Sequence, residues 1–318
     1  MIERTLSQTV AWLCIGAFIL LIVSLGMVTP PTFPHSIVLA TEPLPILPPH
    51  QHGLGAAESD SGHGQYVSSQ VYVVPDDVVV TGMAMSMHNA PSDILLHHLG
   101  VYTNIPGNSA IAGFARDTHF KQFEFPAPYG VFLPKGTKLF LRAMLHNPEP
   151  PEGPGATYRD VSVEVRLRLA ENPTRRDHHL LFHLLALGYP EEPGPETIDT
   201  FTVPSATREY AASPVNTKSL HGVFTFPTDA TVLGMGAHMH GWDGGREVTL
   251  YQNGSPIANY EAHASALSPW TWQSDGDEVV REVRAGDTFS LTALYDNNEP
   301  VPLRGAMGEL GFYYYPIP

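Results

Sequence analysis

The sequence contains a single cysteine, Cys14, which lies in an apolar run near the N-terminus. A disulfide needs two cysteines, and structural zinc sites usually use thiolate ligands. The rest of the chain therefore has neither a disulfide nor a thiolate metal site, and its domains have to be held by packing alone.

Positive charge is also scarce. The chain has 17 lysines and arginines against 32 aspartates and glutamates, which gives a formal net charge of −15. Charged residues make up only 15% of the sequence. Binding to nucleic acid requires a basic surface that can neutralise phosphates. The composition therefore argues against nucleic acid as a partner.

Long apolar runs are missing except at the N-terminus, where Ala11–Val28 carries no charge. This stretch has the minimum length of a membrane-spanning helix and is long for the core of a signal peptide. We predict an uncleaved membrane anchor over residues 1–30, with a cleaved signal segment as the alternative. In either case, the chain from Thr29 onward is expected on the extracytoplasmic side, in a periplasm or outside the cell.

Residues 31–64 are rich in proline, glycine, serine and histidine, and we predict that they form a tether. From Tyr66 the sequence changes to short runs of valine, tyrosine, phenylalanine and leucine between turn residues. The segment Val161–Leu169 alternates apolar and polar residues, which is typical of a half-buried antiparallel strand.

Short strands at regular spacing, broken by glycine and proline turns, favour β-sandwiches. We therefore predict an all-β fold with two tandem sandwich domains, at residues 65–170 and 190–318. Residues 171–189 are expected to be the crossover linker between them.

The chain has 16 histidines, and several fall in suggestive places. His238 and His240 form a His-x-His motif, and on a strand both rings would lie on one face. His97 and His98 are adjacent, so they can share a metal ion only at a bulge or a strand end. His146 ends another predicted strand. The pattern is compatible with metal binding, although single histidines on strands are more often packed or surface residues.

The choice of metal follows from the available donors. Zinc suits the set poorly, because structural zinc sites favour thiolates and catalytic ones usually have a third histidine or a carboxylate. Met307 lies in the last strand region, and a thioether beside imidazoles points to copper.

Four segments resemble the copper type II, ascorbate-dependent monooxygenases, the family of peptidylglycine α-hydroxylating monooxygenase and dopamine β-monooxygenase. They are MSMHNAPSDILLHHLGVY, GVFLPKGTKLFLRAMLHNPEP, VLGMGAHMHGWDGGREVTLYQNG and TALYDNNEPVPLRGAMGELGFYYY. The resemblance covers roughly Tyr66 to Pro316, and the order His-His, His, His-x-His, Met is specific. It implies two jelly-roll-like sandwiches, each carrying one copper, that face each other across a solvent-filled cleft.

The same resemblance implies the ligands. One copper, for electron transfer, would be held by His97, His98 and His146. The other, for oxygen activation, would be held by His238, His240 and Met307. The implied activity is hydroxylation of a C–H bond in a small organic substrate with O2 and an external reductant such as ascorbate.

Two positions depart from the family's peptide-hydroxylating members. Where those have an arginine and a tyrosine that hold a peptide carboxylate, this chain has Gly236 and Gly311. A peptide ending in glycine is therefore not expected as the substrate, and the lack of disulfides suggests a microbial relative. Two alternatives remain: a non-enzymatic copper-binding, delivery or assembly subunit of a membrane complex, and a structural sandwich that keeps only the scaffold.

Overall fold

The computed structural model describes residues 35–46, 65–91, 95–115, 122–147, 156–172, 177–190, 199–240, 244–264, 272–273 and 276–318. Regular structure within these ranges is all β, and the residues from His35 to Pro318 form one compact unit. No helix in the described part of the chain is long and apolar enough to cross a membrane. The predicted anchor at residues 1–30 lies outside these ranges.

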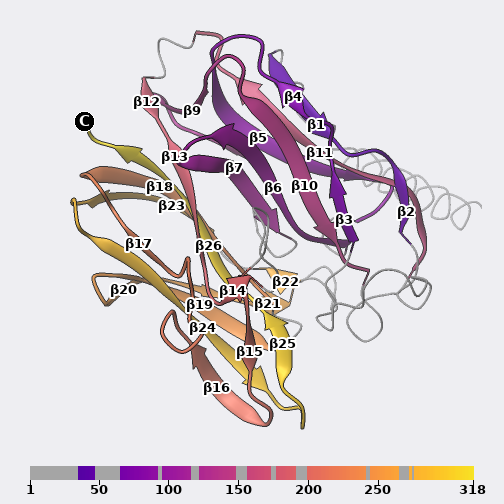
Figure 1. The fold of residues 1–318 in the computed structure, drawn as a ribbon, viewed down its shortest axis with the longest axis vertical. Helices are drawn as coiled ribbons and strands as arrows, with labels where there is room; N and C mark the ends of the chain where they lie inside the picture. Colours follow the sequence, from indigo (N-terminus) through magenta and orange to yellow (C-terminus); the bar gives the residue numbers. More distant parts are fainter. Residues whose placement is uncertain are drawn as a thin grey trace, which may run out of the picture. The chain divides into compact units, whose positions relative to one another are not determined.

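Two sheets make up the first half of the fold, drawn from indigo to magenta in Figure 1. The seven-stranded sheet contains β1 (Ser36–Ala40), β2 (Leu44–Ile46), β5 (Val78–His88), β8 (Gln122–Glu124), β9 (Tyr129–Leu133), β11 (Tyr158–Leu169) and β12 (His178–His179). The five-stranded sheet opposite it contains β3 (Gln65–Ser68), β4 (Tyr72–Val73), β6 (Leu96–Ile105), β7 (Asn108–Ala115) and β10 (Lys138–Leu145).

The side chains of these two sheets form one hydrophobic cluster, the first core, which contains Val163 of β11, Met83 of β5 and Leu141 of β10. The predicted alternation of β11 is confirmed. Val161, Val163, Val165 and Leu167 are fully buried, while the residues between them are partly exposed. When every second side chain of a strand is buried, one face of the sheet packs against the core.

The second half contains four sheets, drawn from pink through orange to yellow in Figure 1. One has the order β13 (Leu181–Ala186), β26 (Gly308–Pro316), β18 (Ala230–Met239) and β23 (Gly276–Val283). Another contains β16 (Thr207–Ala212), β17 (Val223–Thr225), β19 (Gly245–Gln252), β20 (Ser255–Glu261) and β24 (Thr288–Asn297). The small ones are β14 (Tyr189–Pro190) with β15 (Asp199–Val203) and β25 (Leu303–Ala306), and β21 (His263–Ala264) with β22 (Trp272–Gln273).

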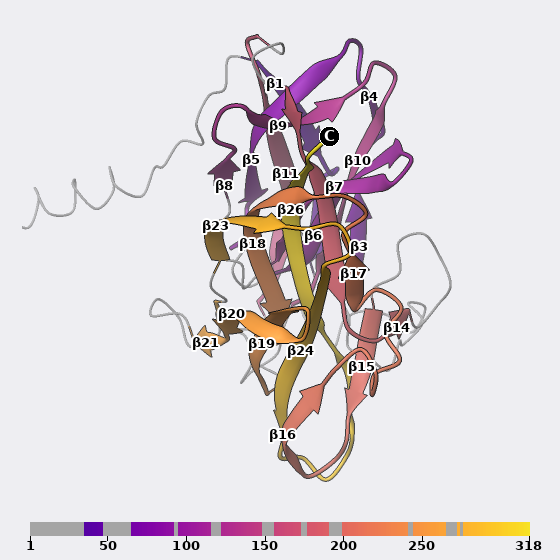
Figure 2. The same cartoon turned by 90° about the vertical axis from the view of Figure 1, so that its left-hand side faces the viewer.

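The larger two of these sheets share a second hydrophobic cluster, the second core, with Val232 of β18, Phe312 of β26 and Leu291 of β24 among its members. The strand β26 runs beside β18 for its whole length, as both Figure 1 and Figure 2 show. The fold is therefore all-β and sandwich-like, as the sequence predicted.

Two segments differ from the sequence-based expectation. Within the predicted tether, β1 pairs with β11 along its whole length and β2 pairs with β11 further on, and Ile37 and Leu39 are buried in the first core. Within the predicted linker, β13 pairs with β26 from Leu181 to Ala186. These short apolar runs gain hydrogen-bonded partners only in the folded chain, which composition alone does not reveal.

The two halves are joined by direct packing. Tyr313 of β26 belongs to the first core, and its hydroxyl donates a 2.9 Å hydrogen bond to the carbonyl oxygen of Ile111 in β7. Its ring lies 4.8 Å from that of Phe125 and 5.1 Å from that of Phe182, measured between centroids. Phe125 belongs to the first core, so this aromatic contact packs β26 against the first half.

Candidate metal centre

His97 and His98 lie at the start of β6, where the ladder with β10 is irregular. Met144 pairs with His98 and the next residue, Leu145, pairs with Leu96, so His97 has no opposite residue. Two adjacent histidines can converge only at a bulge or a strand end, and the ladder has a bulge at this point. His97 is buried, with 3% of its surface exposed, and His98 is half-buried.

His146 follows β10 directly and lies at the same end of this sheet. Its amide donates a 2.8 Å hydrogen bond to the carbonyl of Leu95, just before β6. The ring of His146 is half-buried and lies 6.3 Å from that of His97. The predicted trio of His97, His98 and His146 is therefore gathered at one corner of the first half.

His238 lies near the end of β18, and His240 follows directly after the strand. A register shift beside Gly234, whose φ is +66°, separates this end of β18 from its beginning. Both rings are buried, with 4% and 2% of their surface exposed. Their i, i+2 spacing places them on one side, as the motif predicted, and their centroids are 5.4 Å apart.

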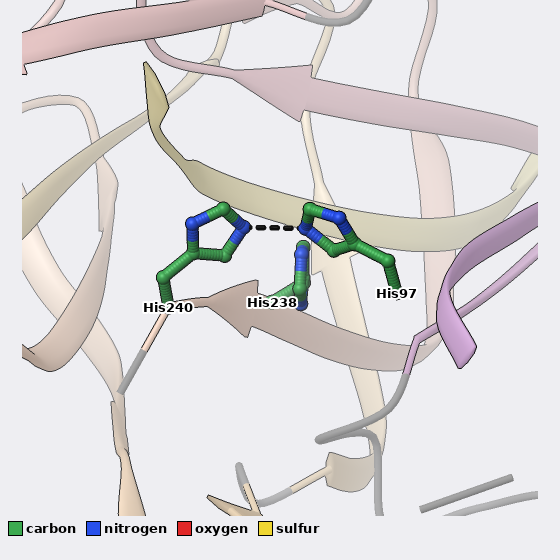
Figure 3. Close-up of side chains that lie close together, drawn as sticks. All are labelled: His97, His238 and His240. Atoms are coloured by element: carbon green, nitrogen blue, oxygen red, sulfur yellow. Dashed lines mark hydrogen bonds between the residues drawn. The ribbon is translucent and has the colours of Figure 1, made fainter. Parts of the chain in front are cut away.

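The histidines of the two halves meet. One ring nitrogen from each of His97, His238 and His240 lies within 4.8 Å of the other two. The Nε2 atoms of His97 and His240 are only 2.6 Å apart, a hydrogen bond in which one ring donates and the other accepts. Figure 3 shows these two rings facing each other, with a nitrogen of His238 directed toward their contact.

His97 is the centre of the wider group. Its ring centroid lies 4.6 Å from that of His240, 4.8 Å from that of His98 and 5.7 Å from that of His238. His98 in turn lies 6.3 Å from His238. The imidazoles that the resemblance assigns to two coppers thus form one continuous group.

This arrangement differs from the expected solvent-filled cleft between two separate centres. His97 belongs to the first predicted set and His240 to the second, yet their rings touch and both are buried. The two halves pack directly on each other, since Tyr313 of β26 belongs to the first core and donates a hydrogen bond to the carbonyl of Ile111 on β7.

Met307 lies between β25 and β26 and is fully buried. The β18–β26 ladder ends with Met239 opposite Gly308, and the same register continued by one residue places His240 opposite Met307. The backbone therefore brings the predicted thioether residue beside the His-x-His motif.

The hydroxyl of Tyr295 connects these two residues. It accepts hydrogen bonds from the amides of His240, at 3.0 Å, and Met307, at 3.3 Å, and donates one of 2.6 Å to the carbonyl of Met307. Sequence reasoning missed this residue, because a tyrosine in an apolar strand gives no sign of where its hydroxyl will point.

Gly236 and Gly311 lie opposite each other on β18 and β26. A Cβ at Gly236 would meet nothing within 4 Å, whereas a Cβ at Gly311 would lie 3.0 Å from the ring of Phe182. The space that a side chain at position 311 would take is thus partly filled by Phe182. Gly236 leaves room two residues before His238.

The electrostatic surroundings of the group include a carboxylate and a phenol. Glu309 is the cross-strand partner of His238. Burial raises the pKa of Tyr102 on β6, and the negative charge of Glu309 raises it further. Tyr102 remains a neutral phenol at physiological pH, and its ring covers Gly100, two residues beyond His98.

The donor set fits a transition-metal ion. Imidazole nitrogens are ligands for zinc, copper, iron and nickel. Two imidazoles on one tetrahedral ion, at about 2.0 Å each, have nitrogens about 3.3 Å apart. The 2.6 Å contact of His97 and His240 is shorter, so a single ion between them requires the rings to part by less than 1 Å. Two ions, one at each ring, would likewise require the hydrogen shared by the two Nε2 atoms to be given up wherever Nε2 is the ligand atom.

Comparison with known proteins adds little. No protein-family model matches the chain, and no curated protein does. Among solved structures, PNGF-II has a TM-score of 0.37 at 8% identity, over 88% of this chain and 65% of that one. A Paenibacillus xanthan lyase has a TM-score of 0.22 at 12% identity, over 91% of this chain and 27% of that one. Dimeric latent PorU from Porphyromonas gingivalis has a TM-score of 0.18 at 14% identity, over 80% of this chain and 25% of that one. Likeness at this level carries no argument about function.

Proposed function

We propose that the protein is an exported copper monooxygenase, related to the ascorbate-dependent family that its motifs resemble, which hydroxylates a C–H bond of a small organic substrate. The proposal includes two tandem jelly-roll sandwiches and an N-terminal membrane anchor. The observation that carries it is the convergence of His97, His238 and His240, since residues from distant motifs meet at one buried point.

The roles of the residues follow from their donor atoms. His238 and His240 would hold one copper together with Met307, whose sulfur favours the reduced ion. His97, His98 and His146 would hold a second copper with imidazole alone, which accepts both oxidation states. When bound, the metal pair supplies O2 activation and the second electron, which an external reductant such as ascorbate replaces.

The contact between His97 and His240 directly connects the two proposed groups of copper ligands. Because the two rings are at hydrogen-bond distance, no other residue separates them. Burial of His97, His238 and His240 keeps water from the group, which limits side reactions of reactive species.

The substrate is expected to lack a carboxylate that needs a clamp. Gly236 and Gly311 offer no charged or hydroxyl-bearing side chain where the family's peptide-hydroxylating members have them. The open space at Gly236 lies on the strand that carries His238 and could receive an uncharged group.

A second candidate is a copper-binding, delivery or assembly subunit without catalysis. The burial of the rings favours it, because His97, His238 and His240 have only 2–4% of their surface exposed. An organic substrate needs free space beside these rings, whereas a stored ion occupies only the space between their nitrogens.

Copper content and oxygen consumption separate the two. We expect two coppers per chain and reductant-dependent O2 uptake for the monooxygenase, and no turnover for the subunit. Met307→Ile should keep the all-histidine copper and abolish O2 uptake and the sulfur signal in X-ray absorption. Met235→Ile, a buried methionine on β18, is the matched control. Unchanged O2 uptake in Met307→Ile would refute the ligand assignment.

A further inference from the structure

The hydroxyl of Tyr295 has all of its hydrogen-bonding capacity engaged at the backbone of two predicted ligands. A hydroxyl has one hydrogen to donate and two lone pairs to accept with. The hydrogen goes to the carbonyl oxygen of Met307, and the lone pairs receive the amides of His240 and Met307. Tyr295 is fully buried, so water does not compete for these bonds.

The ring of Tyr295 is itself held in place. Phe201 packs edge-on against it, with centroids 5.5 Å apart and planes at 89°. Gly245 is its cross-strand partner on β19, and a Cβ there would lie 3.1 Å from the Cζ atom of the phenol. The absence of a side chain at position 245 therefore allows the ring to lie where its hydroxyl reaches the two backbones.

The next residue on β24 continues the same support. The amide of Asp296 donates to the carbonyl of Gly244 at 2.8 Å, and the amide of Gly245 donates to the carbonyl of His240 at 2.9 Å. His240 is thus held through its amide by Tyr295 and through its carbonyl by the amide of Gly245, the residue that pairs with Tyr295. Two consecutive residues of β24, Tyr295 and Asp296, therefore support the backbone of His240, one directly and the other through Gly244.

We infer that Tyr295 is a positioning residue that sets the distance between His240 and Met307 and so fixes an imidazole and a thioether at the spacing one copper requires. This inference rests on the proposed function. It goes further, because it assigns the geometry of the site with the thioether ligand to a side chain that does not itself contact the ion.

The alternative is that Tyr295 only fills space in the second core, to which its buried ring belongs. A tyrosine that only fills the second core would be replaced by phenylalanine with little effect on metal binding, since the two rings have the same shape. A positioning role predicts instead that loss of the oxygen atom frees two backbone segments while the ring stays.

The test compares Tyr295→Phe with Tyr260→Phe, a fully buried tyrosine of the same core on β20. Copper(I) affinity is measured by competition with a chromophoric chelator, and the sulfur contribution by X-ray absorption. We expect Tyr295→Phe to weaken copper binding at the site of His238, His240 and Met307 about 10- to 100-fold, as is typical for residues that orient ligands. The sulfur signal of Tyr295→Phe should be reduced, while the copper affinity of its all-histidine site stays at the wild-type value. Tyr260→Phe should keep the wild-type copper affinities and sulfur signal.

Amide hydrogen exchange provides a readout without copper. In the wild-type protein, the amides of His240 and Met307 should exchange as slowly as those of the second core, and in Tyr295→Phe both should exchange faster. Fast exchange of either amide in the wild-type protein would overturn the inference even if the variant does not fold. So would Tyr295→Phe with unaltered affinity and sulfur signal.

The outcomes also separate this inference from the proposed function. If Met307→Ile loses no sulfur signal because wild type has none, the ligand assignment fails and Tyr295 has no thioether to position. If Met307→Ile removes the signal and Tyr295→Phe leaves it intact, only the positioning role fails.

Discussion

The Nε2 atoms of His97 and His240 lie 2.6 Å apart although the residues are separated by 143 positions in the chain. One ring comes from a bulge in β6 and the other from the end of β18. A contact of this length couples any event at one ring, such as loss of a proton or binding of an ion, to the other ring.

Coupling between His97 and His240 is the first prediction. His97→Ala and His240→Ala should each weaken copper binding strongly, and the double variant should lose less than the product of the two effects. Side chains in contact typically show such non-additive energies of about 0.5–3 kcal/mol. Copper affinities of wild type and the three variants form the required cycle.

His88→Ala is the control for this cycle, since His88 is exposed at the end of β5 and interacts with Glu164 at 3.8 Å. Its copper affinity should match that of wild type. Strictly multiplicative effects of His97→Ala and His240→Ala would mean that the rings act in independent centres, as the resemblance alone implies.

Gly244, which directly precedes β19, yields a second prediction. Gly244 has φ of +89°, and a Cβ there would lie 2.0 Å from the carbonyl oxygen of Asp296. Gly286 has the same φ, but a Cβ there would meet nothing within 4 Å. Gly286→Ala should therefore cost about 1–2 kcal/mol for the left-handed conformation alone. Gly244→Ala should cost more, because the backbone of β24 must also move.

Urea unfolding of both variants gives the comparison, and copper affinity should fall only in Gly244→Ala. Equal losses of stability in the two variants would show that the backbone conformation, and not the close approach to Asp296, makes glycine necessary at position 244.

The pH dependence of stability is expected to report on His183. Its ring packs on Phe224 and Phe312, and burial lowers its pKa from the usual 6.5 to about 4, with the charge of His221 adding to the effect. Between these values the unfolded chain binds more protons than the folded one. The contribution of His183 is therefore present above pH 6.5 and is lost as the pH falls toward 4, by up to about 3 kcal/mol.

His183→Phe isolates this contribution from that of other groups. The buried carboxyl of Asp199, for example, has a raised pKa because of burial, and its effect on stability has the opposite sign. The difference in unfolding free energy between wild type and His183→Phe should change across pH 4–6.5 and stay constant above it. A difference that does not vary with pH would show that the ring takes up its proton without loss of packing.

The contact between the halves provides the fourth prediction. Tyr313→Phe removes the hydrogen bond to the carbonyl of Ile111 and should cost about 1–3 kcal/mol, since that carbonyl loses a buried partner. Copper affinity should fall as well, because this contact holds the histidines of the two halves together. The neighbouring Tyr314→Phe, on the side of the second core, should change copper affinity by less than a factor of two. A Tyr313→Phe protein with normal copper affinity would show that the histidines do not depend on this contact.

Much of the fold was predictable from local patterns. The alternation in Val161–Leu169 identifies β11. The adjacent pair His97–His98 could share a metal ion only at a bulge or a strand end, and the structure has a bulge there. The tether prediction overlooked that the sequence SIVLA also alternates, so that Ile37 and Leu39 are buried while Val38 is exposed. A short edge strand gives a weak signal because its stability comes from pairing with β11.

The convergence of His97 with His238 and His240 was not predictable in the same way. Motif spacing shows which rings share a strand face, but the distance between two faces depends on how the halves pack. That packing depends on Tyr313, Phe182 and Phe125, three aromatic residues that look like ordinary core residues in the sequence. The hydrogen bonds of Tyr295 were not predictable either, because a tyrosine in an apolar strand gives no sign of where its hydroxyl will point.

The bulge in β6 makes the cluster sensitive to the number of residues in this stretch as well as to their identity. Removal of one residue near Leu96 would let the ladder with β10 run without interruption, and the two adjacent imidazoles would then point to opposite sides of the sheet. Every donor atom would still be encoded, yet only one of that pair could face β18. Deletion of Leu96 should therefore weaken metal binding although every histidine of the cluster remains in the chain.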